Sequence, residues 1–241
     1  MKRNIALVVI SIFMAVWSTS ALAAKINPIN YTIWSNVFAD AKWQLGDTGD
    51  TDDVCEYSSD CSDLFNSGTG YKRYIWAESS DNNRLTFSTN GSQARLWRSE
   101  LRFLDNFAKS STITMSGRIG YWAGRSTSDG ITVAQLHMED AEGPPARLEI
   151  IDEDYFQVTF RNSDDCTSNC WTERTFSTST SGWKNFSLYL NNYYINVTVA
   201  GQTRTYKLTT EWSASGDYYW KTGLYLQDAG TAYTAYRNLY W

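Results

Sequence analysis

The chain has 241 residues, of which 42% are hydrophobic and 15% aromatic, and its formal net charge at pH 7 is −5. This aromatic content excludes a disordered chain, and the length allows one sizeable domain with its own core. The acidic balance argues against a nucleic-acid binder, which needs a basic face, but a small basic groove for an acidic substrate can still be present.

The first residues have the pattern of an export signal. Lys2 and Arg3 precede an apolar run, and Ala21-Leu22-Ala23 supplies the small residues of a cleavage site. The run is short for a membrane span, although an uncleaved anchor is the alternative, and no later segment is apolar enough to cross a bilayer. We therefore expect residues 1–23 to be removed. Residues 24–241 then form one exported domain, secreted or periplasmic, that is monomeric and free of the membrane.

Four cysteines, Cys55, Cys61, Cys166 and Cys170, suit an exported protein. An even number of cysteines in an oxidising compartment predicts disulfides, and four cysteines allow three pairings. We favour the two local pairs, Cys55–Cys61 and Cys166–Cys170, because each pair brackets a polar loop. A zinc site is less favoured, because the spacings are not C-x-x-C and the single histidine is distant in sequence.

Most of the chain has the pattern of β-strands. Apolar residues alternate from Thr112 to Tyr121 and again across 186–190 and 195–199, and polar turns separate such runs. A short helix is expected over 36–42. The acidic, serine-rich stretch 46–70 is expected to be a loop insertion. Many short strands joined by polar turns predict an antiparallel sandwich or barrel in a single domain.

Three segments carry candidate chemistry, and each is expected to be a strand. In Arg98-Ser99-Glu100-Leu101-Arg102, alternate residues share a face, so two arginines flank a carboxylate and can donate to an anion. In the second segment Val133, Gln135 and His137 share a face. An amide there can hold a carboxylate while the imidazole exchanges a proton. Alone, each segment could equally be the solvated side of an ordinary strand.

The third segment runs from Tyr219 to Gln227. The residues that share one face of this strand are Tyr219, Lys221, Gly223, Tyr225 and Gln227. We expect Gly223 to leave room for a ligand to approach the backbone. Together the three segments predict a patch of Arg, Gln, His, Lys and Tyr side chains, which suits a carboxylated sugar polymer.

The segments RSELR, QLH and YWKTGLYLQ, in this order, resemble three blocks shared by the alginate lyases of polysaccharide lyase family 7. The likeness extends more loosely from Trp34 to the C-terminus. It implies an all-β jelly roll of two antiparallel sheets, with the motif strands on a concave groove. It also implies cleavage of alginate, a polymer of mannuronate and guluronate, by β-elimination to 4,5-unsaturated ends, without a metal or redox cofactor.

Carried over position by position, the resemblance implies the catalytic residues Arg102, Gln135, His137 and Tyr225. The implied substrate-binding residues are Arg98, Glu100, Lys221 and Gln227. Either arginine could hold the substrate carboxylate, with Arg102 favoured. Tyr225 would protonate the leaving oxygen, and His137 would take the C5 proton when it lies opposite that oxygen. Leu136 departs from the Ile or Val of the family, so the preferred uronate stays open, as does endo or exo cleavage.

Other functions remain open at this point. A non-catalytic carbohydrate-binding module would share the fold and the groove, although binding alone needs neither His137 nor Tyr225. A lyase on another polyuronate, such as glucuronan, would share the chemistry. A glycoside hydrolase would need paired carboxylates. The candidates Glu149, Asp152, Glu153 and Asp154 do not all share a strand face, and a surface turn is the simpler expectation for them.

Overall fold

The computed structural model describes residues 25–26, 28, 32–46, 51–56, 61, 74–78, 81–90, 98–124, 130–139, 141, 143–152, 154–163, 165–168, 170–209, 212, 216–226 and 231–241. The expected export signal and Gln227 lie outside these residues. No helix in the described part of the chain is both long and apolar enough to span a membrane.

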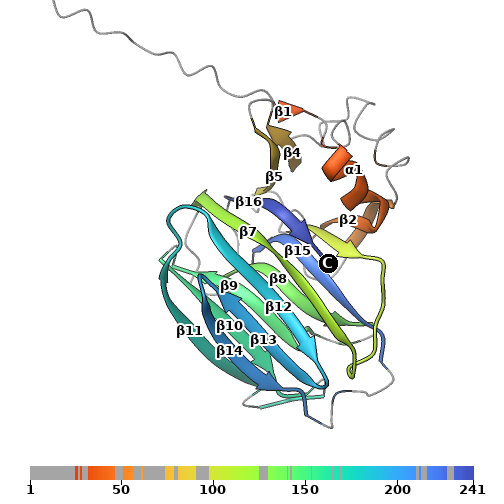
Figure 1. The fold of residues 1–241 in the computed structure, drawn as a ribbon, viewed down its shortest axis with the longest axis vertical. Helices are drawn as coiled ribbons and strands as arrows, with labels where there is room; N and C mark the ends of the chain where they lie inside the picture. Colours follow the sequence, from red (N-terminus) through yellow and green to blue (C-terminus); the bar gives the residue numbers. More distant parts are fainter. Residues whose placement is uncertain are drawn as a thin grey trace, which may run out of the picture.

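Within the described residues, the strands form two eight-stranded antiparallel sheets packed face to face (Figure 1). The first sheet has the order β1 (Lys25–Ile26), β4 (Ile75–Glu78), β5 (Asp81–Asn90), β16 (Thr231–Tyr240), β7 (Thr112–Gly124), β12 (Lys184–Asn191), β13 (Tyr194–Val199) and β14 (Gln202–Lys207). The second sheet has the order β11 (Trp171–Ser179), β10 (Tyr155–Arg161), β9 (Ala146–Ile151), β8 (Ile131–Met138), β15 (Tyr218–Leu226), β6 (Arg98–Phe103), β2 (Ala41–Gly46) and β3 (Thr51–Glu56). This jelly-roll sandwich confirms the predicted fold class.

Alternation along the strands builds the core between the sheets. In β12 and β13 the apolar residues alternate with polar ones, and the cross-strand pairs Phe186–Val199 and Leu188–Val197 are buried. Strands β8 and β15 are buried along nearly their whole length. One of their faces packs in the core, and the other lies under a network of polar side chains. Gln135, His137 and Tyr225 therefore lie on the two central strands of the second sheet.

Two predictions near the N-terminus were partly wrong. The helix α1 spans Thr32–Ala39, and β2 begins at Ala41, so the chain is already a strand at 41–42. The alternation of buried Ala41, Trp43 and Leu45 explains this early change from helix to strand. Within the expected loop 46–70, residues 51–56 form β3, which pairs with β2.

Both local disulfides form, which confirms the favoured pairing. The Cys55–Cys61 bridge is buried at the edge of the second sheet, where Cys55 pairs with Trp43 of β2. The Cys166–Cys170 bridge closes the connection between β10 and β11. Short closed loops of this kind stabilise a fold by about 2 kcal/mol in the chain-entropy description.

Candidate active site

The three motif strands are neighbours, with β15 between β8 and β6. Their register brings the predicted faces together. The cross-strand pairs are Tyr219–His137, Lys221–Gln135, Lys221–Arg102, Gly223–Glu100 and Tyr225–Arg98. Three segments that are distant in the chain thus share one patch on the outer face of the second sheet.

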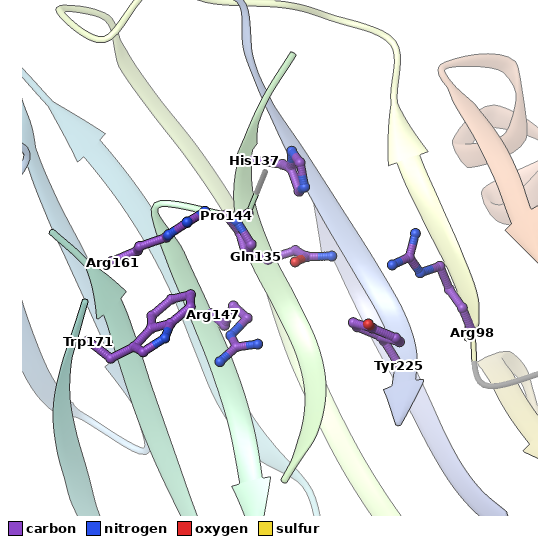
Figure 2. Close-up of a pocket in the computed structure, with 9 residues that line it drawn as sticks. Arg98, Gln135, His137, Pro144, Arg147, Arg161, Trp171 and Tyr225 are labelled. Atoms are coloured by element: carbon purple, nitrogen blue, oxygen red, sulfur yellow. The ribbon is translucent and has the colours of Figure 1, made fainter. Parts of the chain in front are cut away.

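The outer face of the second sheet holds an open pocket of about 270 Å³ (Figure 2). Four of the predicted residues line it: Arg98, Gln135, His137 and Tyr225. Beyond them the pocket continues over β9, β10 and β11, where Arg147, Arg161 and Trp171 line it. Among the residues that the structure describes, no three His, Cys, Asp or Glu side chains gather closely enough to hold a metal ion.

Glu100 is completely buried and contacts three side chains of the motif strands at the bottom of the pocket. Its Oε1 accepts a hydrogen bond from Gln135 Nε2 at 2.9 Å, and its Oε2 lies 3.2 Å from Arg98 Nε and 3.4 Å from Lys221 Nζ. A carboxylate removed from water needs such compensation, because an uncompensated buried charge is strongly destabilising. Glu100 therefore fixes the side chains of Gln135 and Arg98 at the pocket.

Lys221 also lies beneath the pocket rather than in it. Its side chain is 4% exposed, and Lys221 is not among the lining residues. Burial lowers the pKa of Lys221 to about 8, against the attraction of Glu100. Glu100 and Lys221 were expected to bind substrate. The structure places both where they can orient the residues that line the pocket.

His137 is held as a neutral imidazole. Its Nδ1 lies 2.8 Å from Met138 O and 3.0 Å from Tyr219 Oη, and the Tyr219 ring stacks on it. Because a carbonyl oxygen only accepts, Nδ1 carries the proton and Nε2 keeps its lone pair. Burial, with the charge of Lys221, lowers the pKa of His137 to about 3. The imidazole is therefore neutral at ordinary pH with a lone pair on Nε2, although the lowered pKa also makes it a weaker base than an ordinary histidine.

The two arginines of the first motif have different surroundings. Arg98 lines the pocket, where its Cζ lies 4.3 Å from the centroid of the Tyr225 ring. Arg102 is not a lining residue. Its guanidinium forms an ion pair with Glu139 and lies over the Tyr219 ring, with Cζ 4.1 Å from the centroid. The structure brings Arg98, rather than the favoured Arg102, together with the other catalytic candidates.

Two expectations about the motif strands were wrong: that Gly223 leaves room for a ligand, and that Val133 shares the face of Gln135. Gly223 has a φ of +145°, and a Cβ there would meet Ser99 O at 2.5 Å and Glu100 Cα at 2.6 Å, so the backbone of β6, not a ligand, uses the space. Val133 does not face the pocket with Gln135. The pairing of β8 with β9 shifts between Thr132 and Ala134, and Val133 is fully buried in the core.

The expected surface turn is correct for Asp152 and Asp154, which are exposed between β9 and β10, but wrong for Glu149. Glu149 lies on β9 and is 2% exposed. It accepts a hydrogen bond from Thr159 Oγ1 at 2.5 Å and pairs with Arg147, and burial raises the pKa of its carboxyl. Sequence reasoning treated Glu149 only as a candidate acid and missed Arg147, although Arg147-Leu148-Glu149 repeats the Arg-x-Glu spacing of Arg98-Ser99-Glu100.

A protein-family model described as alginate lyase matches residues 41–241. No curated protein sequence matches significantly. Similar solved structures include the alginate lyase AlyC3, 16% identical with a TM-score of 0.72 over 90% of this chain and 95% of that one. A variant of the family 7 alginate lyase A1-II', in complex with the substrate GGMG, is 18% identical with a TM-score of 0.69 over 90% and 96%. The marine PL7 alginate lyase AlyA1 from Zobellia galactanivorans is 17% identical with a TM-score of 0.60 over 84% and 94%.

Proposed function

Since this chain belongs to the alginate lyase family and is a polysaccharide lyase, we propose that it cleaves alginate by β-elimination in the pocket lined by Arg98, Gln135, His137 and Tyr225. The observation that carries this proposal is that these four side chains line one pocket, where the buried carboxylate of Glu100 contacts Arg98 and Gln135. Each reaction cuts the chain and leaves a 4,5-unsaturated uronate at the new non-reducing end. Residues 1–23 have the pattern of an export signal, so we place the enzyme outside the cytoplasm, secreted or periplasmic.

Arg98 and Gln135 stabilise the substrate carboxylate. The C5 proton of a uronate is barely acidic, because removing it adds electron density next to a carboxylate that is already charged. Donors aimed at that carboxylate stabilise the extra charge, and removing one such donor typically costs about 100- to 1,000-fold in rate. The contacts of Arg98 and Gln135 with Glu100 support this role, because they orient both donors before substrate arrives.

His137 and Tyr225 move the protons. A base takes the C5 proton, the electron pair of that C–H bond becomes the C4–C5 double bond, and the bond from C4 to the bridging oxygen breaks. Tyr225 then donates its phenolic proton to the departing oxygen. Neutral His137 is the base when the C5 proton and the leaving oxygen lie on opposite faces. When both lie on the same face, Tyr225 starts as the phenolate, takes the C5 proton and then donates that same proton to the departing oxygen.

The first prediction concerns Tyr225→Phe, which keeps the ring and removes only the phenolic proton. We expect turnover on alginate to fall at least about 100-fold, because a positioned general acid contributes roughly that much, while affinity for the polymer changes little. The ultraviolet absorbance of the unsaturated product measures turnover, and calorimetry measures binding. Tyr194→Phe is the matched control, since Tyr194 is 43% exposed on β13 of the other sheet.

The substrates are mannuronate-rich alginate, guluronate-rich alginate and glucuronan. Full activity of Tyr225→Phe would reject the mechanism. Binding of alginate by the unsubstituted protein without any absorbing product would identify a carbohydrate-binding module instead. Product from glucuronan alone would assign the same chemistry to a different polyuronate.

A further inference from the structure

The pocket extends past the catalytic candidates to a second group of side chains. Arg147 of β9, Arg161 of β10 and Trp171 of β11 line its far part, across Gln135 from Arg98 (Figure 2). Arg161 pairs with Trp171 across the β10–β11 register. The Cζ atoms of Arg147 and Arg161 lie 4.5 and 5.6 Å from the centroid of the Trp171 ring, and 39% of Trp171 is exposed.

A buried carboxylate holds Arg147, as Glu100 holds Arg98. Arg147 Nε lies 3.4 Å from Glu149 Oε1, and Glu149 is 2% exposed. Thr159 donates to Glu149 Oε2 at 2.5 Å. Burying a carboxylate under a groove costs free energy unless the carboxylate is paired with a cation. Glu149 is therefore a positioning residue, because its ion pair holds the guanidinium of Arg147 in place. Arg147 also neighbours Gln135 across the strands, so the second group adjoins the first.

The position of the Arg161 guanidinium depends on the absence of a side chain at Gly143. A Cβ on Gly143 would lie 2.7 Å from Arg161 Nη1, so only a residue without a side chain leaves the guanidinium in its observed place. Gly143 itself lines the pocket. The Arg161 guanidinium therefore lies at the wall of the pocket rather than out in solvent.

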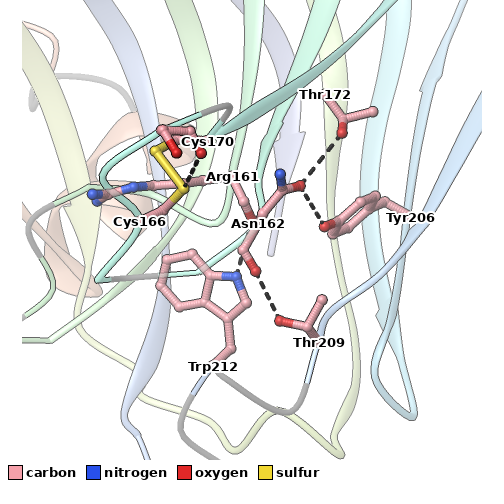
Figure 3. Close-up of a disulfide and its surroundings, with 9 residues drawn as sticks. Arg161, Asn162, Cys166, Cys170, Thr172, Tyr206, Thr209 and Trp212 are labelled. Carbon is pink, nitrogen blue, oxygen red and sulfur yellow. Dashed lines mark hydrogen bonds between the residues drawn. A yellow bond between two sulfur atoms is a disulfide. The ribbon is translucent and has the colours of Figure 1, made fainter.

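A disulfide and several hydrogen bonds hold the end of the β10–β11 hairpin in place (Figure 3). The Cys166–Cys170 disulfide closes the connection immediately before Trp171. Trp212 Nε1 donates to Arg161 O at 3.0 Å, and Thr209 Oγ1 donates to Asn162 O at 2.8 Å. Asn162 N donates to Cys170 O at 2.8 Å. Contacts of this kind hold both pocket residues of the hairpin in place before any ligand binds, which lowers the entropy lost on binding.

These side chains have the chemistry of a uronate site. The indole offers apolar surface to the C–H face of a sugar ring, and two guanidinium groups offer several donors to one carboxylate. Glu173, exposed on β11 two residues after Trp171, is an acidic neighbour of the group and acts electrostatically on Glu149. We propose that Arg147, Arg161 and Trp171 form a second uronate subsite, which binds another sugar of the chain being cleaved. This inference rests on the proposed function. Substrates long enough to occupy this subsite are therefore cleaved more efficiently than shorter ones.

The second prediction tests this subsite through the effect of substrate length. We compare kcat/KM on the polymer with kcat/KM on the shortest oligomer that the unsubstituted protein cleaves. In Trp171→Ala and in Arg161→Gln this ratio should fall roughly tenfold, the change expected when one good contact is lost. Arg147 is left unchanged, because its removal would leave the Glu149 carboxylate buried without its cation.

Trp183→Ala is the matched control, because Trp183 sits in a similar arrangement next to the other sheet. Arg237 and Arg118 have their Cζ atoms 4.3 and 5.9 Å from the Trp183 ring centroid. Thermal unfolding checks that all variants are folded. An unchanged ratio in both pocket variants, or an equal fall in Trp183→Ala, would overturn the subsite. Absence of product from every polyuronate in the unsubstituted protein would instead refute the proposed function itself.

Discussion

At the scale of single residues, burial decides the protonation state of His137. The pKa of His137 is lowered from 6.5 to about 3 in the folded protein, first by burial and then by Lys221. Between these pH values the unfolded chain binds a proton that the folded protein does not. The contribution of His137 to the free energy of unfolding is therefore complete above pH 6.5 and is lost as pH falls toward 3.

The third prediction follows from this difference in pKa. In His137→Asn the free energy of unfolding should vary less steeply between pH 4 and 6.5 than in the unsubstituted protein. The difference in slope is at most about 1.4 kcal/mol per pH unit, the equivalent of one proton. Urea unfolding at several pH values measures it, and the carboxyl groups that titrate in the same range are common to both proteins. Equal slopes would show that His137 titrates normally in the fold.

At the scale of single elements, the approach of β15 to β6 depends on Gly223. Its positive φ is unfavourable for any other residue, and a side chain would collide with the backbone of Ser99 and Glu100. Because Glu100 holds both Arg98 and Gln135, a displacement of β6 would reach the catalytic side chains directly. The strand pairing and the site geometry thus depend on the same glycine.

The fourth prediction is that Gly223→Ala lowers the free energy of unfolding by about 1–3 kcal/mol and strongly reduces kcat. Gly201→Ala is the control, since Gly201 also has a positive φ but has nothing within 4 Å of the added Cβ. It should cost only about 1 kcal/mol and leave kcat unchanged. Urea unfolding and product absorbance measure the two effects. If both variants behaved alike, the contact with β6 would be unimportant.

At the scale of the whole molecule, the first sheet supports the irregular strands that carry the site. The pairing of β15 with β8 shifts between Thr222 and Tyr225. There the hydroxyl of Tyr236, on β16 of the first sheet, lies 2.5 Å from both Val133 O and Gly223 O. Burial raises the pKa of Tyr236, so the phenol keeps its single proton, which the two carbonyl groups share. One side chain therefore crosses the core and contacts the backbone of two site strands.

The fifth prediction is that Tyr236→Phe lowers the free energy of unfolding by about 0.5–1.5 kcal/mol, the contribution of one hydrogen bond, because Thr222 and Thr234 still donate to the two carbonyl groups. The ring contacts with Phe87 and Phe186 remain in the variant, so packing changes little. Tyr240→Phe, on the same strand but 65% exposed, should leave stability unchanged. Equal stability of the two variants in urea would show that the hydroxyl contributes nothing.

Much of the fold was predictable, because alternation along a strand is a local property. Period-two runs located β7, β12 and β13, and the same alternation placed Gln135 with His137 and Arg98 with Glu100. The short cysteine spacings made the local disulfides the simplest choice, and these pairs form. The order of the three motifs indicated the family that the protein-family model then matched.

What the sequence by itself determined is therefore which residues share a face wherever the strand pairing is regular, and which chemistry those residue types can perform. Only the tertiary structure decided which of the residues on one strand face come together in the pocket. Arg98 and Arg102 are equivalent by alternation, but Arg102 meets Glu139 and Arg98 meets Tyr225. Val133 enters the core because a shift in pairing breaks the alternation. Burial, register shifts and close backbone approaches arise between strands distant in sequence, so no local pattern along one strand encodes them.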